Sequence, residues 1–221
     1  MSDLDPTLPP PTALEELRPK AREALLAARA VFLEEGYDGA KMDTIARVAS
    51  LSKATLYAHF ASKSDLFEAL IRHECRAVNA SLYRPDPGNP RMTDELRKVA
   101  ANYRQIFIHK AGIELYRILV PVAPRFPRLA RTFYAEGPSA TIRQLADYLG
   151  VLRDTGRLRL PDADLAARQF LALVTEDIKL NGALGLPAAS ARQTEKIITS
   201  GIAMFVSVYA VAQQDERVTV D

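Results

Sequence analysis

The sequence predicts an all-α protein of about nine helices. Apolar residues recur every three or four positions through most of the chain, which is the spacing of a helix that buries one face. Prolines and glycines lie between these periodic segments, where they end helices. Strand signals are nearly absent, because the one alternating stretch, 157–160, is short and isolated. The chain has 221 residues, of which 48% are hydrophobic, so a sizeable core can form.

The first helices are predicted in the N-terminal third of the chain. Residues 1–12 hold four prolines and two aspartates, leave little apolar surface to bury and are expected to be disordered. Gly36 is expected to end the first helix. The periodicity predicts helices over 14–35, 43–49, 53–60 and 64–83.

The clearest break in the chain follows these helices. Residues 84–90 hold three prolines and a glycine, which cannot continue a helix. Further helices are predicted over 92–110, 112–123, 126–154, 163–181 and 189–213. These breaks predict a tail (1–12), a helix-turn-helix domain (13–63), a connecting helix (64–83) and a C-terminal helical domain (84–221).

Residues 42–60 carry the strongest motif, two short helices joined by the three-residue turn 50–52. Asp43 or Thr44 is expected to cap the first helix, and Ser52 the second. Such a unit places its second helix in the major groove of DNA, although two short helices can also simply pack within a bundle. The residues expected to face inward are Ile45, Val48, Ala49, Leu51, Leu56 and Phe60.

The charges and hydroxyls of this segment suit DNA. The overall net charge is only +2, but residues 44–63 contain Arg47, Lys53 and Lys63 and no carboxylate. The lysines can neutralise phosphates, hydroxyls can bind phosphate oxygens, and Ala54 or Thr55 can contact base edges. For Tyr57 the alternative to a DNA contact is a place in the core, and for His59 it is a solvated side chain. The predicted DNA contacts are Thr44, Ser52, Lys53, Ala54, Thr55, Tyr57, His59 and Lys63.

These residues resemble the DNA-binding domain of the TetR/AcrR family of regulators, from about Ala24 to Leu70 without a gap. The family commonly has glycine where this chain has Ser50; if φ is positive there, serine costs about 1 kcal/mol. The segment 113–134 is similar to the C-terminal domain of AefR-like regulators of this family. The matching elements are 27–37, Ile45-Ala46, Ser52-Lys53, Thr55-Leu56-Tyr57, Phe60, Lys63 and Leu66-Phe67.

The resemblance implies a sequence-specific transcriptional regulator, with double-stranded operator DNA and a small-molecule effector as partners. The usual family behaviour is a repressor that a small, largely apolar ligand releases from its operator. An activator, and a ligand that promotes DNA binding, are the alternatives that stay open. The last two predicted helices have apolar residues on more than one face, which favours a homodimer through 163–213, with Ile202 and Phe205 in the contact. A monomer with one large core is the alternative.

Aromatic and polar residues within the apolar C-terminal helices are the ligand candidates. An apolar pocket with a few polar groups is the usual small-molecule site, although an aromatic residue at helical spacing often belongs to the core. A ligand near the C-terminal half of the connecting helix, 71–78, could tilt that helix. The candidates are Tyr103, Phe107, Tyr116, Phe133, Tyr148, Phe170 and Asp177.

The sequence gives little support to an enzyme or a membrane protein. We expect no catalytic residue, cofactor or metal, since the chain lacks a phosphate-binding loop and a nucleophile elbow and has one cysteine. No apolar run approaches the roughly 20 residues of a membrane span, and no signal peptide is present, so a cytoplasmic protein is expected. The alternatives are chemistry at His73-Glu74-Cys75 and phospholipid binding by a basic stripe of Arg125, Arg128 and Arg131.

Overall fold

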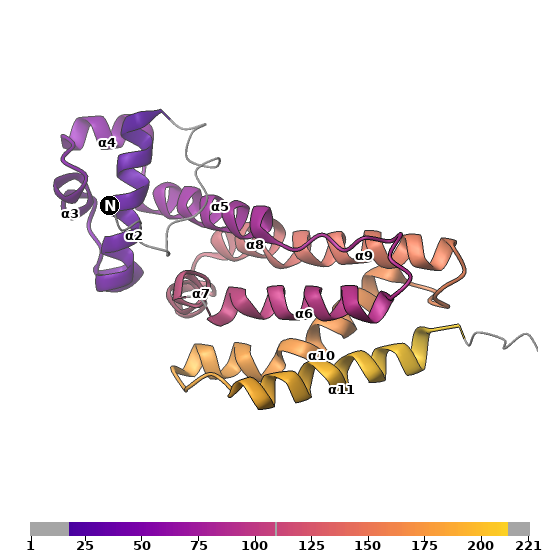
Figure 1. The fold of residues 1–221 in the computed structure, drawn as a ribbon. Helices are drawn as coiled ribbons and strands as arrows, with labels where there is room; N and C mark the ends of the chain where they lie inside the picture. The colour runs from indigo at the N-terminus through magenta and orange to yellow at the C-terminus, as the bar shows by residue number, and fades with distance from the viewer. Residues whose placement is uncertain (1–17, 109, 212–221) are drawn as a thin grey trace, which may run out of the picture. The chain divides into compact units, whose positions relative to one another are not determined.

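The computed structural model describes residues 18–108 and 110–211, and its regular elements are all helices (Figure 1). An isolated bridge between Leu158 and Ala210 is the only β pairing in these residues. The all-α prediction is therefore confirmed, while the predicted tail 1–12 lies outside the described part of the chain. The ten helices of the described part are α2 (Pro19–Gly39), α3 (Met42–Val48), α4 (Lys53–His59), α5 (Lys63–Ser81), α6 (Met92–Ile108), α7 (Lys110–Val122), α8 (Pro127–Glu136), α9 (Pro138–Asp154), α10 (Ala163–Leu184) and α11 (Ala191–Tyr209).

The count differs from nine because the predicted helix 126–154 is two helices. The break is at Gly137, where backbone torsions leave the helical region, and Pro138 then begins α9. A Cβ atom at Gly137 would lie 3.2 Å from the Cys75 sulfur, so glycine lets this turn approach α5 closely. Near the N-terminus, Gly36 adopts φ 70°, as expected of a helix-ending glycine, but a further helical segment follows it directly to Gly39.

The described residues form two compact units, and α6, α9 and α10 each contribute residues to both. The first comprises the described parts of Met1–Tyr83, Asn102–Thr141 and Asp177–Ala188. The second comprises the described parts of Arg84–Ala101, Ile142–Glu176 and Ala189–Asp221. The first unit thus joins the helix-turn-helix segment to α7 and α8.

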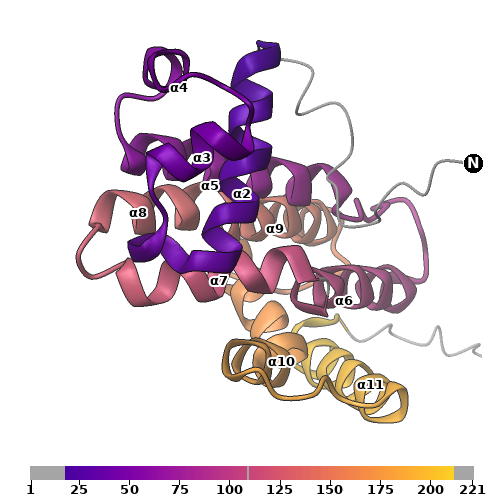
Figure 2. The same ribbon diagram turned by 90° about the vertical axis from the view of Figure 1, so that its left-hand side faces the viewer.

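The first unit has a continuous core centred on aromatic rings. Phe32 of α2 contacts Phe67 of α5 with ring centroids 4.7 Å apart, and Tyr37 lies 5.1 Å from Phe67. Phe126, just before α8, lies 4.9 Å from Tyr37. Figures 1 and 2 show α8 running beside α5. Burial of these large rings anchors α2, α5 and α8 to one another.

In the second unit α10 and α11 lie side by side (Figures 1 and 2). Phe170 contacts Phe205 with centroids 5.3 Å apart, and a Cβ at Gly201 would lie 3.0 Å from Val174, so the two helices approach closely. Phe205 and Ile202 are buried inside the protomer. The prediction that these two side chains form the dimer contact is therefore wrong, because they fill the core between α10 and α11.

The proline-rich segment 84–90 is held by side chains of the second unit. Arg157 donates hydrogen bonds to the carbonyl oxygens of Pro87, Asn89 and Pro90 at 2.8–2.9 Å. The buried carboxylate of Glu95 accepts from the Asp86 amide at 2.9 Å. The backbone groups that a helix would satisfy internally are thus satisfied by side chains at this break.

Candidate nucleic-acid interface and ligand cavity

The turn between α3 and α4 depends on one residue in the left-handed region. Ser50 has φ 54° and is the only non-glycine residue with positive φ among the described residues. The Leu51 amide donates to the Ala46 carbonyl at 2.9 Å, and the Ser50 amide donates to the Arg47 carbonyl at 3.1 Å. This pair of bonds is a Schellman motif, which reverses the chain after α3 and usually has glycine at the position of Ser50.

Helix α4 begins with the cap that the sequence predicts. The Ser52 hydroxyl oxygen accepts a hydrogen bond from the Thr55 amide at 3.0 Å, and the two side-chain oxygens lie 2.8 Å apart. Leu56 is fully buried, so one face of α4 is held against the first unit's core. For α3 the expected cap is wrong: the N-cap is Lys41, and Asp43 and Thr44 lie in the first turn.

The opposite face of α4 is open to solvent. Lys53, Ala54 and Tyr57 are exposed, whereas Thr55 and His59 are half-buried. Lys53 pairs with Asp43 across the turn, with nitrogen and oxygen 2.6 Å apart, and both side chains are exposed. Val48, expected to face inward, is 47% exposed because α3 ends there and turns its last residue outward. Thr44, on α3, is half-buried.

Lys63 has contacts that its sequence position did not predict. Its Nζ donates to the carbonyl oxygens of Tyr37, Ala40 and Asp38, at 2.7, 2.9 and 3.2 Å respectively. The ammonium also lies 4.8 Å from the Tyr37 ring centroid. An ammonium has three protons, so these carbonyls can engage all of them. The ammonium of Lys63 binds the backbone at the end of α2. Lys63 therefore has two competing roles, this structural contact and the expected contact with a DNA phosphate.

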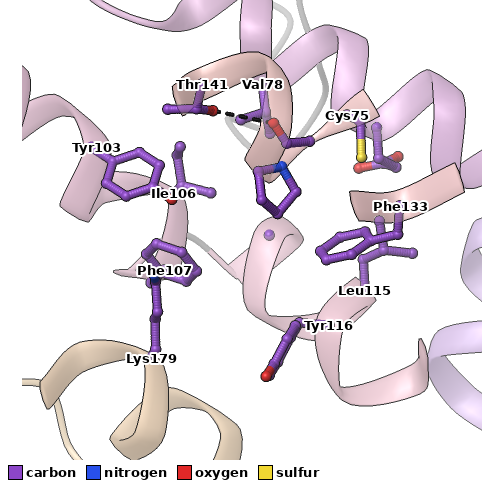
Figure 3. Close-up of a pocket in the computed structure, with 14 residues that line it drawn as sticks. Cys75, Val78, Tyr103, Ile106, Phe107, Leu115, Tyr116, Phe133, Thr141 and Lys179 are labelled. Atoms are coloured by element: carbon purple, nitrogen blue, oxygen red, sulfur yellow. Dashed lines mark hydrogen bonds between the residues drawn. The ribbon is translucent and has the colours of Figure 1, made fainter. Parts of the chain in front are cut away.

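A cavity of about 230 Å³ lies within the first unit. Figure 3 shows the rings of Tyr103, Phe107, Tyr116 and Phe133 around it, four of the seven residues that the sequence nominated for a ligand site. Its walls are otherwise mostly apolar, as expected of a site for a small organic molecule. The other lining residues are Glu74, Cys75, Val78, Ile106, Gly112, Leu115, Gly137, Pro138, Thr141 and Lys179.

The remaining nominated ligand residues do not line this cavity. Tyr148 and Phe170 are buried in the second unit, where Phe170 packs on Phe205, so the core interpretation holds for Phe170. The side chain of Asp177 lies outside the described residues. Periodicity alone could not separate a ring that faces a cavity from one that faces the core, because both lie on buried faces.

Two neighbouring side chains of α5 bring polar atoms to the cavity. The Oε1 of Glu74 lies 3.3 Å from the Nε of Arg29 on α2. Burial raises the pKa of Glu74, and Arg29 opposes that shift. Burial raises the pKa of the Cys75 thiol to about 12, so the thiol is protonated near neutral pH. Neither residue was among the ligand candidates predicted from the sequence. The available signal was a charged residue, Glu74, in the buried stripe of an amphipathic helix.

The opposite side of the cavity carries Lys179 of α10 (Figure 3). Its Nζ lies 5.4 Å from the Phe107 ring centroid and 5.8 Å from that of Tyr103. These two rings meet edge to face, with centroids 5.5 Å apart. Burial raises the pKa of Tyr103 to about 12, so its hydroxyl keeps its proton near neutral pH. One side of the cavity therefore combines ring surfaces, a hydroxyl and a cation.

Two arginines of the predicted basic stripe are in ion pairs. Arg125 lies 2.6 Å from the carboxylate of Asp38, and Arg128 lies 2.6 Å from that of Glu68. These contacts bind α8 and the turn before it to α2 and α5, which weakens the phospholipid interpretation. Within the described residues, no helix is long and apolar enough to cross a bilayer. The same residues contain no cluster of three or more potential metal ligands from His, Cys, Asp and Glu.

Two family descriptions match the chain. Residues 24–70 match "Bacterial regulatory proteins, tetR family", and residues 94–211 match "AefR-like transcriptional repressor, C-terminal domain". The first covers the helix-turn-helix and the start of α5. The second covers more than half of the chain and includes every helix from α7 to α11.

Individual relatives support the same assignment. The solved structure of the "Flavonoid-responsive Regulator FrrA" is 38% identical, has a TM-score of 0.79, and aligns over 87% of this chain and 98% of FrrA. UidR, a transcriptional regulator of Escherichia coli K12, is 36% identical over 73 residues, 33% of this chain and 37% of UidR. The activator FasR of Mycolicibacterium smegmatis is 46% identical over 50 residues, 23% of each chain. The chain thus spans little more than a third of the length of curated relatives such as UidR.

Proposed function

Because this chain belongs to the TetR family of transcriptional regulators, we propose that it is a homodimeric repressor released from its operator by an aromatic ligand. The family and its structural neighbours are regulators rather than enzymes. The observation that carries the proposal is the solvent-exposed face of α4. The helix begins at the Ser52 cap, and its buried Leu56 packs the opposite face against the core. The AefR-like match over residues 94–211 favours repression over the activation that FasR performs.

The proposed DNA contacts divide by chemistry. Ala54 and Thr55 lie in the first turn of α4, the part of a recognition helix that reaches base edges. Contacts to phosphate oxygens position the protein on DNA without reading its sequence. The residues whose side chains suit such contacts are Thr44, Ser52, Lys53, Tyr57 and His59. The Lys53–Asp43 pair is exposed, so phosphate can replace the carboxylate as its partner.

The proposed dimer uses the solvent face of α10 and α11 in the second unit. Leu165 is 48% exposed, Met204 55% and Val208 70%, and the last two lie one helical turn apart on α11. A surface groove bounded by Leu173, Ile197 and Met204 lies on the same pair of helices. A second copy of these helices would cover this apolar surface, as expected of a two-fold contact.

The first unit's cavity is the proposed effector site. Its ring-lined wall suits a flat aromatic molecule, and FrrA, the relative with the same fold over most of its length, is described as flavonoid-responsive. We therefore propose flavonoid-like compounds as the ligand class. The predicted ligand position near 71–78 agrees with the cavity's contacts to Glu74, Cys75 and Val78.

The proposed switch runs through α5. This helix lines the cavity with Glu74, and the same carboxylate pairs with Arg29 of α2. Helix α2 in turn contacts α3 and α4, so a shift at Glu74 reaches the helix-turn-helix through one helix. A ligand releases the operator only if it binds the DNA-incompetent arrangement more tightly, and the coupling is then reciprocal.

The proposal is tested by selecting duplexes from a random pool with the purified protein. We expect enrichment of an inverted repeat, because two helix-turn-helix units related by a two-fold axis recognise two half-sites. A gel shift with the selected duplex is then repeated with added flavones, which should weaken the complex. Selection of non-repetitive or single-stranded DNA would overturn the regulator proposal, while an unchanged complex with every flavone would overturn only the ligand class.

A further inference from the structure

Asp43 of α3 is the only carboxylate in the sequence between residues 39 and 64, and it contacts the first residue of α4. We propose that Asp43 reads a cytosine in each half-site of the operator, by accepting a hydrogen bond from the N4 amino group of that base in the major groove. This inference rests on the proposed function, the binding of operator DNA through α4. It adds a base contact from α3 to those proposed for α4.

The first support is the position of the carboxylate. Its Oδ2 lies 2.6 Å from the Nζ of Lys53, which begins α4. Helices α3 and α4 also pack on each other. The first turn of a recognition helix is the part that reaches base edges, so a carboxylate in contact with Lys53 lies beside the bases that this turn reads. The Asp43 side chain is 60% exposed, so DNA can reach it.

The second support is that this ion pair can be exchanged. Both side chains are exposed, and ion pairs in water contribute little to stability. Phosphates of the operator therefore compete for the ammonium of Lys53. When Lys53 turns to a phosphate, the Asp43 carboxylate loses its partner in an interface that excludes water, where an unpaired charge is costly. A hydrogen-bond donor on the DNA then takes the place of the ammonium.

The third support is the chemistry of the base edges. A carboxylate only accepts hydrogen bonds, whereas guanine presents two acceptors in the major groove, and thymine an acceptor and a methyl group. Adenine has a donor at N6 but also an acceptor beside it at N7, which repels a carboxylate. Cytosine presents its N4 amino group alone, so it is the base that complements Asp43 best.

The experiment selects duplexes from a random pool with the wild type, Asp43→Ala and Asp43→Asn. We expect the wild type to select cytosine at one position of each half-site, and Asp43→Ala to lose its preference at that position alone. Asp43→Asn should prefer adenine there, because an amide accepts from N6 and donates to N7. For duplexes with cytosine or thymine at this position of one half-site, wild-type dissociation constants should differ about tenfold, and those of Asp43→Ala by less than about twofold.

Two further variants separate a direct base contact from an indirect effect. Lys53→Met should bind all duplexes more weakly yet keep the cytosine preference, because Asp43 does not act through the lysine. Asp154→Asn, which neutralises another exposed, ion-paired aspartate in the second unit, should leave every preference unchanged. Circular dichroism checks that each variant keeps its helix content.

The same selected sequence for the wild type and Asp43→Ala, or a cytosine preference that Lys53→Met abolishes, would overturn the assignment. So would an Asp43→Ala protein that binds all duplexes more tightly by one common factor, since the carboxylate would then only repel DNA. Failure of the wild type to enrich any inverted repeat would overturn the regulator proposal, and this inference with it.

Discussion

The guanidinium of Arg29 on α2 and the carboxylate of Glu74 on α5 form an ion pair, with Nε and Oε1 3.3 Å apart. Both side chains are largely sheltered, at 21% and 9% exposure. Glu74 also lines the aromatic cavity, and α2 carries the contacts to α3 and α4. This pair joins a residue that lines the proposed effector site to the helix that contacts the proposed DNA-reading helices.

Breaking the pair should reduce the coupling between ligand and operator. Coupling free energies between two sites are typically about 1–3 kcal/mol, which corresponds to roughly 5–150-fold in affinity. We expect Arg29→Met to bring the ratio of 7-hydroxyflavone affinities, measured without and with operator, toward one. Glu34→Gln, which alters an exposed charge on the same helix, serves as the control. An unchanged ratio in Arg29→Met would place the coupling elsewhere.

Replacing Ser50 with glycine should stabilise the protein. Ser50 has φ 54°, a conformation that costs a residue with a Cβ about 1 kcal/mol more than glycine. Urea unfolding should therefore show a gain of that order for Ser50→Gly. Ala49→Gly is the matched control, since Ala49 has φ −75° and glycine there should destabilise the protein. A loss of stability in Ser50→Gly would mean that the serine side chain contributes more than the strain costs.

Lys63→Met should lower the free energy of unfolding. The variant loses the three hydrogen bonds to carbonyls at the end of α2 but keeps the aliphatic stem beside Tyr37. We expect a loss on the order of 1–3 kcal/mol, because hydrogen bonds to charged groups lie in this range.

The salt dependence of operator binding distinguishes this role from a phosphate contact. Lys53→Met, at an exposed side chain of α4, should reduce the salt slope by about one phosphate contact and leave stability nearly unchanged. Lys63→Met should leave that slope at its wild-type value. A reduced slope with unaltered stability in Lys63→Met would restore the phosphate assignment that its sequence position suggested.

Val208→Asp should convert the proposed dimer to a folded monomer. Val208 is 70% exposed, so an aspartate is tolerated in the free protomer but would be an unpaired charge in an apolar contact. Light scattering gives the mass, and circular dichroism checks that helix content is retained. Val151→Asp, at another exposed valine of the second unit, should remain dimeric. A dimeric Val208→Asp protein would require an interface outside this face.

Much of the fold follows from local sequence rules. The periodicity from Ala21 to Phe32 and the cap at Ser52 depend on residues close together in the chain. The sequence also marked Ser50 as a position that is strained if φ is positive, because the resembling family commonly has glycine there, and the structure supplies the positive φ. The division of 126–154 into two helices was within reach, since Gly137-Pro138 is itself a break signal.

What only the tertiary structure decided is the surroundings of side chains that lie far apart in sequence. The helical period says that Phe107 and Phe170 are both buried, but only packing puts one beside a cavity and the other in the α10–α11 core. Lys63 is a surface lysine by sequence, and its ammonium reaches carbonyls 23 to 26 positions earlier. The sequence by itself determined most of the helices, the cap at Ser52 and the helix-turn-helix motif, because these depend on local spacing. The cavity and its charges depend on which helix faces pack together. The spacing of residues along one helix shows which face is buried but not which other helix covers it.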